Sequence, residues 1–140
     1  MKRPALMAFS AIFIASAATA QSDSTGAKPA APGVYTVEQA ERGKATHAMN
    51  CTSCHGTEAY SGDSFVKAWG GRTAFAFFDQ LRTTMPNDNP GGLKREEYID
   101  VIAYIFSLNG LPAGPQELKA DDDLLKTIKI DSIPSAPKQP

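Results

Sequence analysis

Two cysteines and a histidine fall within five consecutive residues, and this run limits the possible folds more than any other part of the chain. It reads Cys51-Thr52-Ser53-Cys54-His55, and it holds both cysteines of the 140-residue chain. The spacing Cys-x-x-Cys-His is typical of the covalent attachment site of a c-type haem. Each thiol can form a thioether with one vinyl group of the porphyrin, and the adjacent imidazole can then bind the iron. We therefore predict one covalently bound haem c, attached through Cys51 and Cys54, with His55 as an iron ligand.

Met85 is the predicted second iron ligand. It precedes Pro86 and lies between a predicted helix and a loop rich in Pro, Asn and Gly. Met49 lies too close to Cys51 to reach the opposite face of the haem. The alternative is that Met85 only fills space in the core, which is a common role of methionine.

The two cysteines have three other possible uses. A Cys-x-x-Cys disulfide closes a very short loop, and the stabilisation that a disulfide gives grows with loop length. A thioredoxin-like redox pair requires a strand-helix-strand pattern around it, which the sequence lacks. A zinc site requires further Cys or His ligands at recognisable spacing, and the chain has only His47 and His55.

The N-terminus predicts export. Met1-Lys2-Arg3-Pro4 precedes an apolar run that ends in Ala18-Thr19-Ala20. This pattern predicts a secretory signal peptide over residues 1–20 and a periplasmic mature protein. The alternative is an uncleaved anchor, but the run is shorter than the about 20 apolar residues that span a bilayer. No other segment is apolar enough to span a membrane.

The charge of the mature chain argues against nucleic acid as a partner. Removal of Lys2 and Arg3 leaves 12 basic and 15 acidic residues, a net charge of −3. The sequence has no basic run that would bind nucleic acid and no basic amphipathic helix that would bind a membrane surface.

The periodicity of the apolar residues predicts an all-α fold. Residues 21–33 are small, polar and Pro-rich, which predicts a flexible leader before a domain over 34–110. A first helix is expected over 37–50, with a capping box made by Thr36 and Gln39. Gly43 inside this helix predicts close approach by another backbone. The expected partner is a helix over 94–109, whose apolar stripe is Tyr98, Val101, Ile102, Ile105 and Leu108.

The region between these two helices is predicted to face the haem. Residues 56–63 are expected to form a loop, and 65–69 a short helical or irregular turn. Residues 73–82 are expected to form another short helix, with Phe77 widening its apolar face. Phe75, Phe78 and Leu81 are expected to form the wall of the haem pocket. Gly110 is expected to end the last helix in a left-handed cap.

The C-terminal extension, residues 111–140, has two interpretations. Between 116 and 130 an acidic run, residues 121–123, lies among five apolar residues, which are Leu118, Leu124, Leu125, Ile128 and Ile130. They predict a segment that packs over the domain; the alternative is a segment that docks a partner. The end, residues 132–140, is predicted to be disordered.

Together, these features resemble the class I cytochromes c. The resemblance rests on Gly43, on Cys51-x-x-Cys54-His55, on Met85-Pro86 and on the helix that contains Val101-Ile102-Ala103-Tyr104. It implies an all-α fold in which an N-terminal and a C-terminal helix cross near a glycine and short helices wrap one haem. In that family an aromatic residue four positions before the first cysteine packs against an aromatic residue of the last helix. Tyr104 matches the second position, but His47 stands at the first.

His47 is either a packed residue of that crossing or an iron ligand. As a ligand it would give a bis-histidine haem of lower potential. It lies one helical turn before Cys51, on a helix held edge-on to the porphyrin, which is poor geometry for the distal side. We therefore expect it to pack beside Tyr104.

The run from Phe65 to Leu118 also resembles the cytochrome domains and subunits that accompany quinoprotein (PQQ-type) alcohol dehydrogenases. This resemblance implies a class of redox partner and no catalytic site. It also makes Trp69 and Arg72 candidates for hydrogen bonds to the haem propionates, the alternative being a core Trp69 and a solvated Arg72. Lys67, Lys94 and Arg95 either surround the exposed haem edge and attract an acidic partner or form an ordinary solvated surface.

The predicted function is therefore electron transfer and not catalysis. We expect a periplasmic mono-haem cytochrome that carries single electrons from a dehydrogenase toward an oxidase-side acceptor of the respiratory chain. One alternative is a haem enzyme or ligand sensor in which Met85 is displaceable. Another is a fixed cytochrome subunit of a dehydrogenase complex.

Overall fold

The computed structural model describes residues 33–130. The predicted signal peptide, nearly all of the predicted leader and the predicted disordered end lie outside the described residues. The helices in the described part are α1 (Val37–Asn50), the 3₁₀ helix η1 (Thr57–Tyr60), α2 (Gly62–Trp69), α3 (Ala74–Thr84), α4 (Arg95–Leu108) and α5 (Asp122–Thr127). Residues 33–130 contain no strand, only an isolated bridge between Thr73 and Lys129. The expected all-α fold is confirmed. Each helix in this range is too short or too polar to cross a membrane.

Helix α1 has the bounds that the sequence predicts. The Thr36 hydroxyl accepts a hydrogen bond from the Gln39 backbone N–H at 3.1 Å, so Thr36 caps the helix. The other half of the expected capping box is wrong, because the Gln39 side chain does not turn back to Thr36. Instead it binds the backbone of Leu118, 79 residues further along the chain.

Helices α1 and α4 cross at Gly43. A Cβ atom on this residue would overlap the backbone carbonyl of Asp100 in α4. The expected close approach of two backbones is therefore confirmed, and it explains a glycine inside a helix, where glycine costs about 1 kcal/mol relative to alanine. Arg42 lies next to the crossing, and its Nε donates to Asp100 Oδ2 at 3.0 Å.

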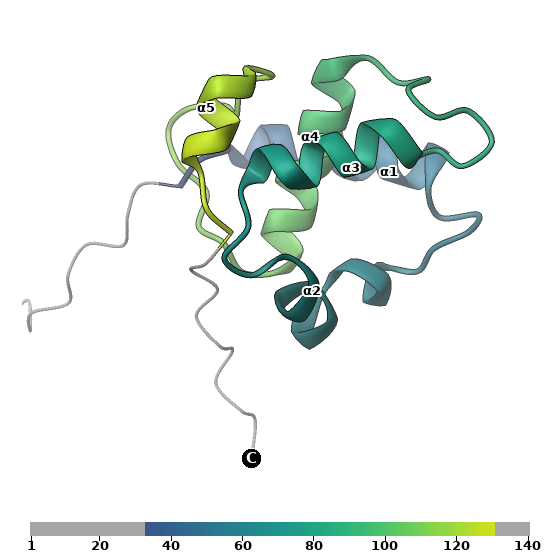
Figure 1. Cartoon of the computed structure of the whole chain (residues 1–140), viewed down its shortest axis with the longest axis horizontal. Helices are drawn as coiled ribbons and strands as arrows, with labels where there is room; N and C mark the ends of the chain where they lie inside the picture. Colours follow the sequence, from purple (N-terminus) through teal and green to yellow (C-terminus); the bar gives the residue numbers. More distant parts are fainter. Residues whose placement is uncertain (1–32, 131–140) are drawn as a thin grey trace, which may run out of the picture.

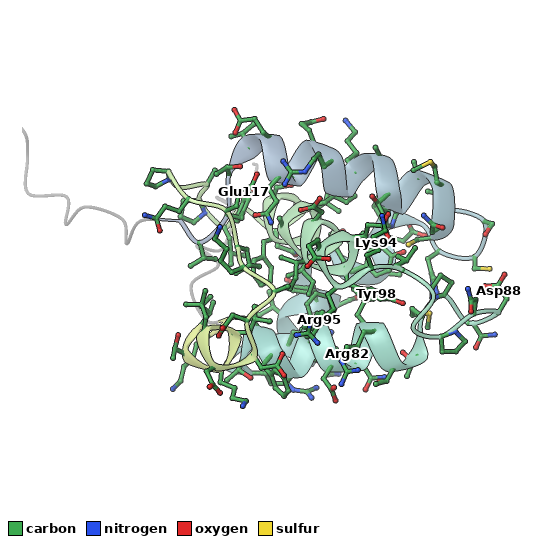
Figure 2. The ribbon with its side chains drawn as sticks, turned by 90° about the horizontal axis from the view of Figure 1, so that it is seen from above. Arg82, Asp88, Lys94, Arg95, Tyr98 and Glu117 are labelled. Atoms are coloured by element: carbon green, nitrogen blue, oxygen red, sulfur yellow. The ribbon has the colours of Figure 1, made fainter. Side chains whose placement is uncertain are left out.

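Helix α4 is buried on more than one side. It lies between α1 and α3 in both views (Figures 1 and 2). The predicted stripe is buried at Tyr98, Val101, Ile102 and Ile105, but Leu108 is 36% exposed, which corrects the prediction for that residue. Ile99, Ala103 and Phe106 are buried as well, because neighbouring segments cover a second face. Gly110 ends the helix region with a φ of 73°, the left-handed conformation expected of it.

Short helices connect α1 to α4. The expected loop 56–63 contains η1 and the first residues of α2, so the loop prediction is wrong there. Thr73 caps α3, since its hydroxyl accepts from the Ala76 N–H at 3.2 Å. Gly71, with a φ of 76°, allows the sharp turn between α2 and α3.

Residues 111–130, which we call the strap, run across the outside of the helices. The strap contributes three buried apolar residues, Leu118, Leu125 and Ile130, to the same core as α1, α3 and α4. Backbone hydrogen bonds fix its end: Ile130 N–H donates to Arg72 O at 2.8 Å, and Gly71 N–H donates to Ile130 O at 2.9 Å. Helix α5 is seen beside α3 in Figure 1. The strap therefore joins the first and the middle parts of the domain.

Candidate haem-binding site

A cavity of about 660 Å³ opens between the end of α1, helix α3 and helix α4. This volume falls within the about 300–1,000 Å³ of typical ligand and cofactor sites. Its lining includes the side chains singled out as attachment residues and iron ligands, which are Cys51, Cys54, His55 and Met85. Trp69 also lines it. The fold thus brings residues from three separate parts of the chain to one cavity.

A tight turn at the end of α1 holds the two thiols and the imidazole. Cys51 caps the helix, and its N–H donates to His47 O at 2.9 Å. The Cys51 carbonyl in turn accepts from the backbone N–H of Cys54 at 3.2 Å and of His55 at 3.0 Å. Both thiols are free, with Cys51 half-buried and Cys54 exposed. Burial raises the pKa of the Cys51 thiol, so this thiol is protonated at neutral pH.

The backbone of Met85 is held from both sides. Its N–H donates to Leu81 O at 2.9 Å as the cap of α3, and its carbonyl accepts from the Tyr98 hydroxyl at 2.6 Å. The peptide bond to Pro86 is cis. Since Tyr98 belongs to α4 and is buried, both α3 and α4 fix the position from which the Met85 side chain enters the cavity.

His47 lies in the helix crossing and also reaches the cavity wall. It is 3% exposed, and its ring centroid is 5.3 Å from that of Tyr104, as expected for a packed residue. Its Nε2 shares a hydrogen bond of 3.0 Å with the Tyr60 hydroxyl, a partner that the sequence did not indicate. Burial lowers the pKa of His47, so the ring is neutral at pH 7.

The apolar wall of the cavity differs from the predicted one. Leu81 lines the cavity as expected, but Phe77 stands where Phe75 and Phe78 were expected. Phe78 is fully buried under Arg95, whose guanidinium carbon is 4.7 Å from the ring centroid, and Phe75 lies beside Lys126. Of the three residues at this spacing only Leu81 lines the cavity, because the strap packs on the side of α3 that carries Phe75 and the cavity uses the side that carries Phe77.

Trp69 and Arg72 form a stacked pair at one side of the cavity. The guanidinium carbon of Arg72 is 4.2 Å from the centroid of the Trp69 ring, and Trp69 packs on Phe77 with a centroid distance of 4.5 Å. Trp69 lines the cavity, while Arg72 is an exposed residue behind it. The structure therefore places the two candidates together, with Trp69 nearer to the site.

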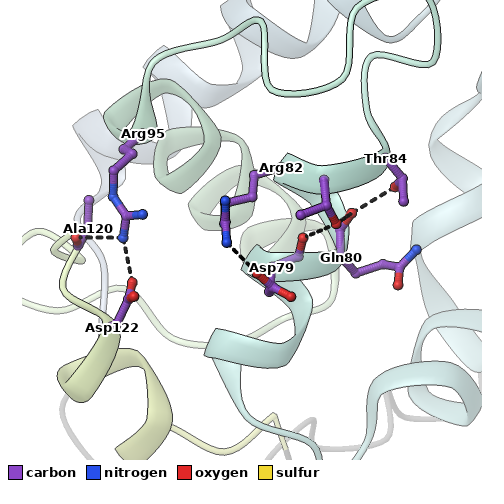
Figure 3. A network of polar contacts seen from close by, with 8 residues as sticks. Asp79, Gln80, Arg82, Thr84, Arg95, Ala120 and Asp122 are labelled. Atoms are coloured by element: carbon purple, nitrogen blue, oxygen red, sulfur yellow. Dashed lines mark hydrogen bonds and ion pairs between the residues drawn. The ribbon is translucent and has the colours of Figure 1, made fainter.

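The structure favours an ordinary solvated surface over a ring of basic residues around the cavity. Lys67, Lys94 and Arg95 are absent from its lining, to which residues 33–130 contribute Asp88 as the one side chain from among Lys, Arg, Asp and Glu. Figure 2 shows Asp88 on the loop after α3, apart from Lys94 and Arg95. Arg95 pairs with Asp122 and donates to Ala120 O at 3.2 Å, so it binds the strap (Figure 3).

The donor set of the cavity fits haem better than a bare metal ion. Within the part of the chain that the structure describes, no group of three or more Cys, His, Asp and Glu side chains could hold an ion. The cavity instead combines two free thiols, one imidazole and one thioether with apolar walls from Phe77, Leu81, Leu93, Val101 and Ile105. In c-type cytochromes two thiols attach the porphyrin, and an imidazole and a thioether bind the iron.

Comparison with known proteins agrees with this donor set. The model of one family, "Cytochrome C oxidase, cbb3-type, subunit III", matches residues 38–105, just under half of the chain. No curated protein and no solved structure gave a significant match. The matched range contains both cysteines, His55, Met85 and the α1–α4 crossing. Residues 38–105 of this chain are therefore similar to a c-type cytochrome domain, a helical domain that carries electrons on covalently bound haem.

Proposed function

We propose that the protein is a mono-haem c-type cytochrome that carries single electrons. In this proposal Cys51 and Cys54 form the thioethers, and His55 and Met85 are the two axial ligands. The observation that carries it is the convergence of these four side chains on one apolar cavity of cofactor size. One Cys-x-x-Cys-His run supports one haem.

The cavity residues suit electron transfer better than chemistry on a substrate. Haem c, when bound, supplies an iron that alternates between ferric and ferrous states. A neutral thioether from Met85 favours the ferrous state and raises the potential. Because α3 and α4 both hold the Met85 backbone, the ligand position changes little when the charge of the site changes. Trp69, stacked with Arg72, is proposed to hydrogen-bond a propionate from the side of the cavity.

The finer role we propose is periplasmic electron transport. The N-terminal pattern supports export, and the matching family is a subunit of a respiratory oxidase. The resemblance of residues 65–118 to cytochromes of quinoprotein alcohol dehydrogenases makes such a dehydrogenase the candidate donor. The acceptor is then an oxidase-side protein of the respiratory chain.

Optical spectra of the protein produced with a haem-attachment system test the proposal. The ferric protein should show a weak band at about 695 nm that reports His/Met ligation. Met85→Ala should abolish this band and retain the covalent haem, while Met49→Ala is the matched control and should leave the band in place. Haem that is extracted by acidified acetone, or free thiols found by mass spectrometry on mature protein, would contradict the proposal.

A fixed subunit that docks through the strap is the second candidate, and the structure favours it less. The strap already buries Leu118, Leu125 and Ile130 in the core of its own domain. Among the large apolar side chains of the strap, Leu124 is exposed, with 41% of its surface accessible. Co-purification with a large dehydrogenase subunit, lost on Leu124→Asp, would support this second candidate.

A further inference from the structure

Tyr60 joins the helix crossing to the proposed iron ligand His55. It lies at the end of η1, half-buried, and lines the cavity. Its ring stands at 62° to the His55 ring with a centroid distance of 5.8 Å, an edge-to-face arrangement. Such a contact restricts the rotation of the imidazole, since edge-to-face aromatic pairs favour particular interplanar angles.

Two buried polar residues hold Tyr60 in place. The Tyr60 hydroxyl and His47 Nε2 share the hydrogen bond of 3.0 Å, and the two rings also meet at 90°. Asn109, at the end of α4, donates from Nδ2 to the Tyr60 carbonyl at 2.8 Å and accepts from Gly62 N–H at 2.9 Å. His47 is 3% and Asn109 6% exposed, so both anchors are buried. Tyr60 is therefore fixed at its hydroxyl and at its backbone.

We propose that Tyr60 is a positioning residue that sets the orientation of the His55 imidazole plane, and that its hydrogen bond to His47 is what fixes it. This inference rests on the proposed function, because it assumes that His55 binds haem iron. It also gives His47 a role that packing alone does not require. The histidine anchors the hydroxyl of Tyr60, which an all-carbon aromatic ring at position 47 cannot do. The helix crossing and the iron site are thereby connected through three rings.

The test uses the hydroxyl-deleting variant Tyr60→Phe, the variant His47→Phe and the double variant, all as ferric haem-loaded protein. The readout is the pattern of paramagnetically shifted haem-methyl proton resonances, which depends on the angle of the axial imidazole plane. Each single variant should change the order or spread of these resonances. The double variant should add little to either single change, because both substitutions remove the same hydrogen bond. The midpoint potential should shift in the same non-additive way.

Tyr104→Phe is the matched control. It removes the hydroxyl from the other tyrosine ring that packs on His47, at the same centroid distance of 5.3 Å, but leaves the bond to Tyr60 intact. Its haem-methyl pattern should stay that of the wild type. Circular dichroism and haem content establish that each variant is folded.

Two results would overturn the inference. One is an unchanged haem-methyl pattern in Tyr60→Phe; the other is additive changes in the double variant. Either result leaves the proposed function standing, provided that the wild type shows the band of His/Met ligation. Loss of that band from the wild type would instead contradict the proposed function itself.

Discussion

The side-chain amide of Gln39 pairs with both backbone polar groups of Leu118. Its Nε2 donates to Leu118 O at 2.9 Å, and Leu118 N–H donates to its Oε1 at 2.8 Å. Both residues are buried, at 2% and 3% exposure. The Gln39 side chain thus pairs with the backbone of the strap as a neighbouring strand would, and it connects the strap to α1.

Gln39→Leu should destabilise the protein strongly. It leaves the N–H and the C=O of Leu118 buried without partners, and each such group costs about 1–3 kcal/mol. We expect the free energy of unfolding, measured by urea denaturation of the haem-loaded protein, to fall by about 2–6 kcal/mol. Glu41→Ala, an exposed change on the same helix, is the control and should stay within about 0.5 kcal/mol. A loss no larger than that of the control would show that the pairing contributes nothing.

Gly43→Ala should destabilise the protein although alanine is the better helix former. The new Cβ would overlap the carbonyl of Asp100, and backbone cannot move aside as a flexible side chain can. Overpacking of this kind costs about 1–3 kcal/mol or more, which exceeds the about 1 kcal/mol that helix propensity returns. Thermal denaturation should show a lower midpoint. Lys44→Ala, exposed beside it, should leave the midpoint unchanged, and a midpoint raised by Gly43→Ala would mean that the helices separate freely.

His47 should make stability depend on pH. Burial lowers the pKa of the folded form below that of the unfolded chain, so below about pH 6.5 the unfolded state binds more protons. The contribution of His47 to the free energy of unfolding is then fully present above that pH, and it is lost as the pH drops toward the lowered pKa. Urea denaturation between about pH 7 and pH 5 should show this fall in the wild type and a smaller one in His47→Phe. An equal dependence on pH in the two proteins would show that His47 is not the group responsible.

Arg95→Ala should weaken the strap without altering electron exchange. Arg95 stacks over Phe78, pairs with the half-exposed Asp122 and donates to the Ala120 carbonyl (Figure 3). An exposed ion pair and a cation–π contact together contribute about 1 kcal/mol, and this is the expected loss in the free energy of unfolding. The rate of reduction by a small inorganic reductant in stopped-flow should stay unchanged, since Arg95 does not line the cavity. Lys67→Ala should change neither quantity. A slower reduction of Arg95→Ala would indicate that Arg95 lies at the exposed haem edge and contributes to electron exchange.

The parts of the fold that local sequence determines were predictable. Thr36 marks the start of α1 through its hydroxyl, and Gly110 marks the end of α4 through its left-handed backbone. The Cys51–His55 run indicates its own site. Gly43 was informative because glycine weakens a helix, so its presence there indicates a position where a side chain does not fit.

The parts that depend on distant segments were not predictable from periodicity. Gln39 has the residue type of a capping box, and only the position of the strap shows that its amide is used elsewhere. Phe77, instead of Phe78, lines the cavity because the strap occupies the other face of α3. Helix α5 could have been predicted from Asp121 and the two acidic residues that follow, which favour a helix N-terminus. The Asp121 carboxylate caps the helix by accepting from Leu124 N–H at 2.7 Å.

The distance along the chain between Gln39 and Leu118 bears on the order of assembly. Ribosomes make the first helix long before the partner of its buried amide exists, and contacts between such remote residues form slowly. During this interval the amide of Gln39 lacks the partner that it has in the folded domain. A chain cut short before Leu118 would therefore leave a polar group of the first helix without either of its hydrogen bonds.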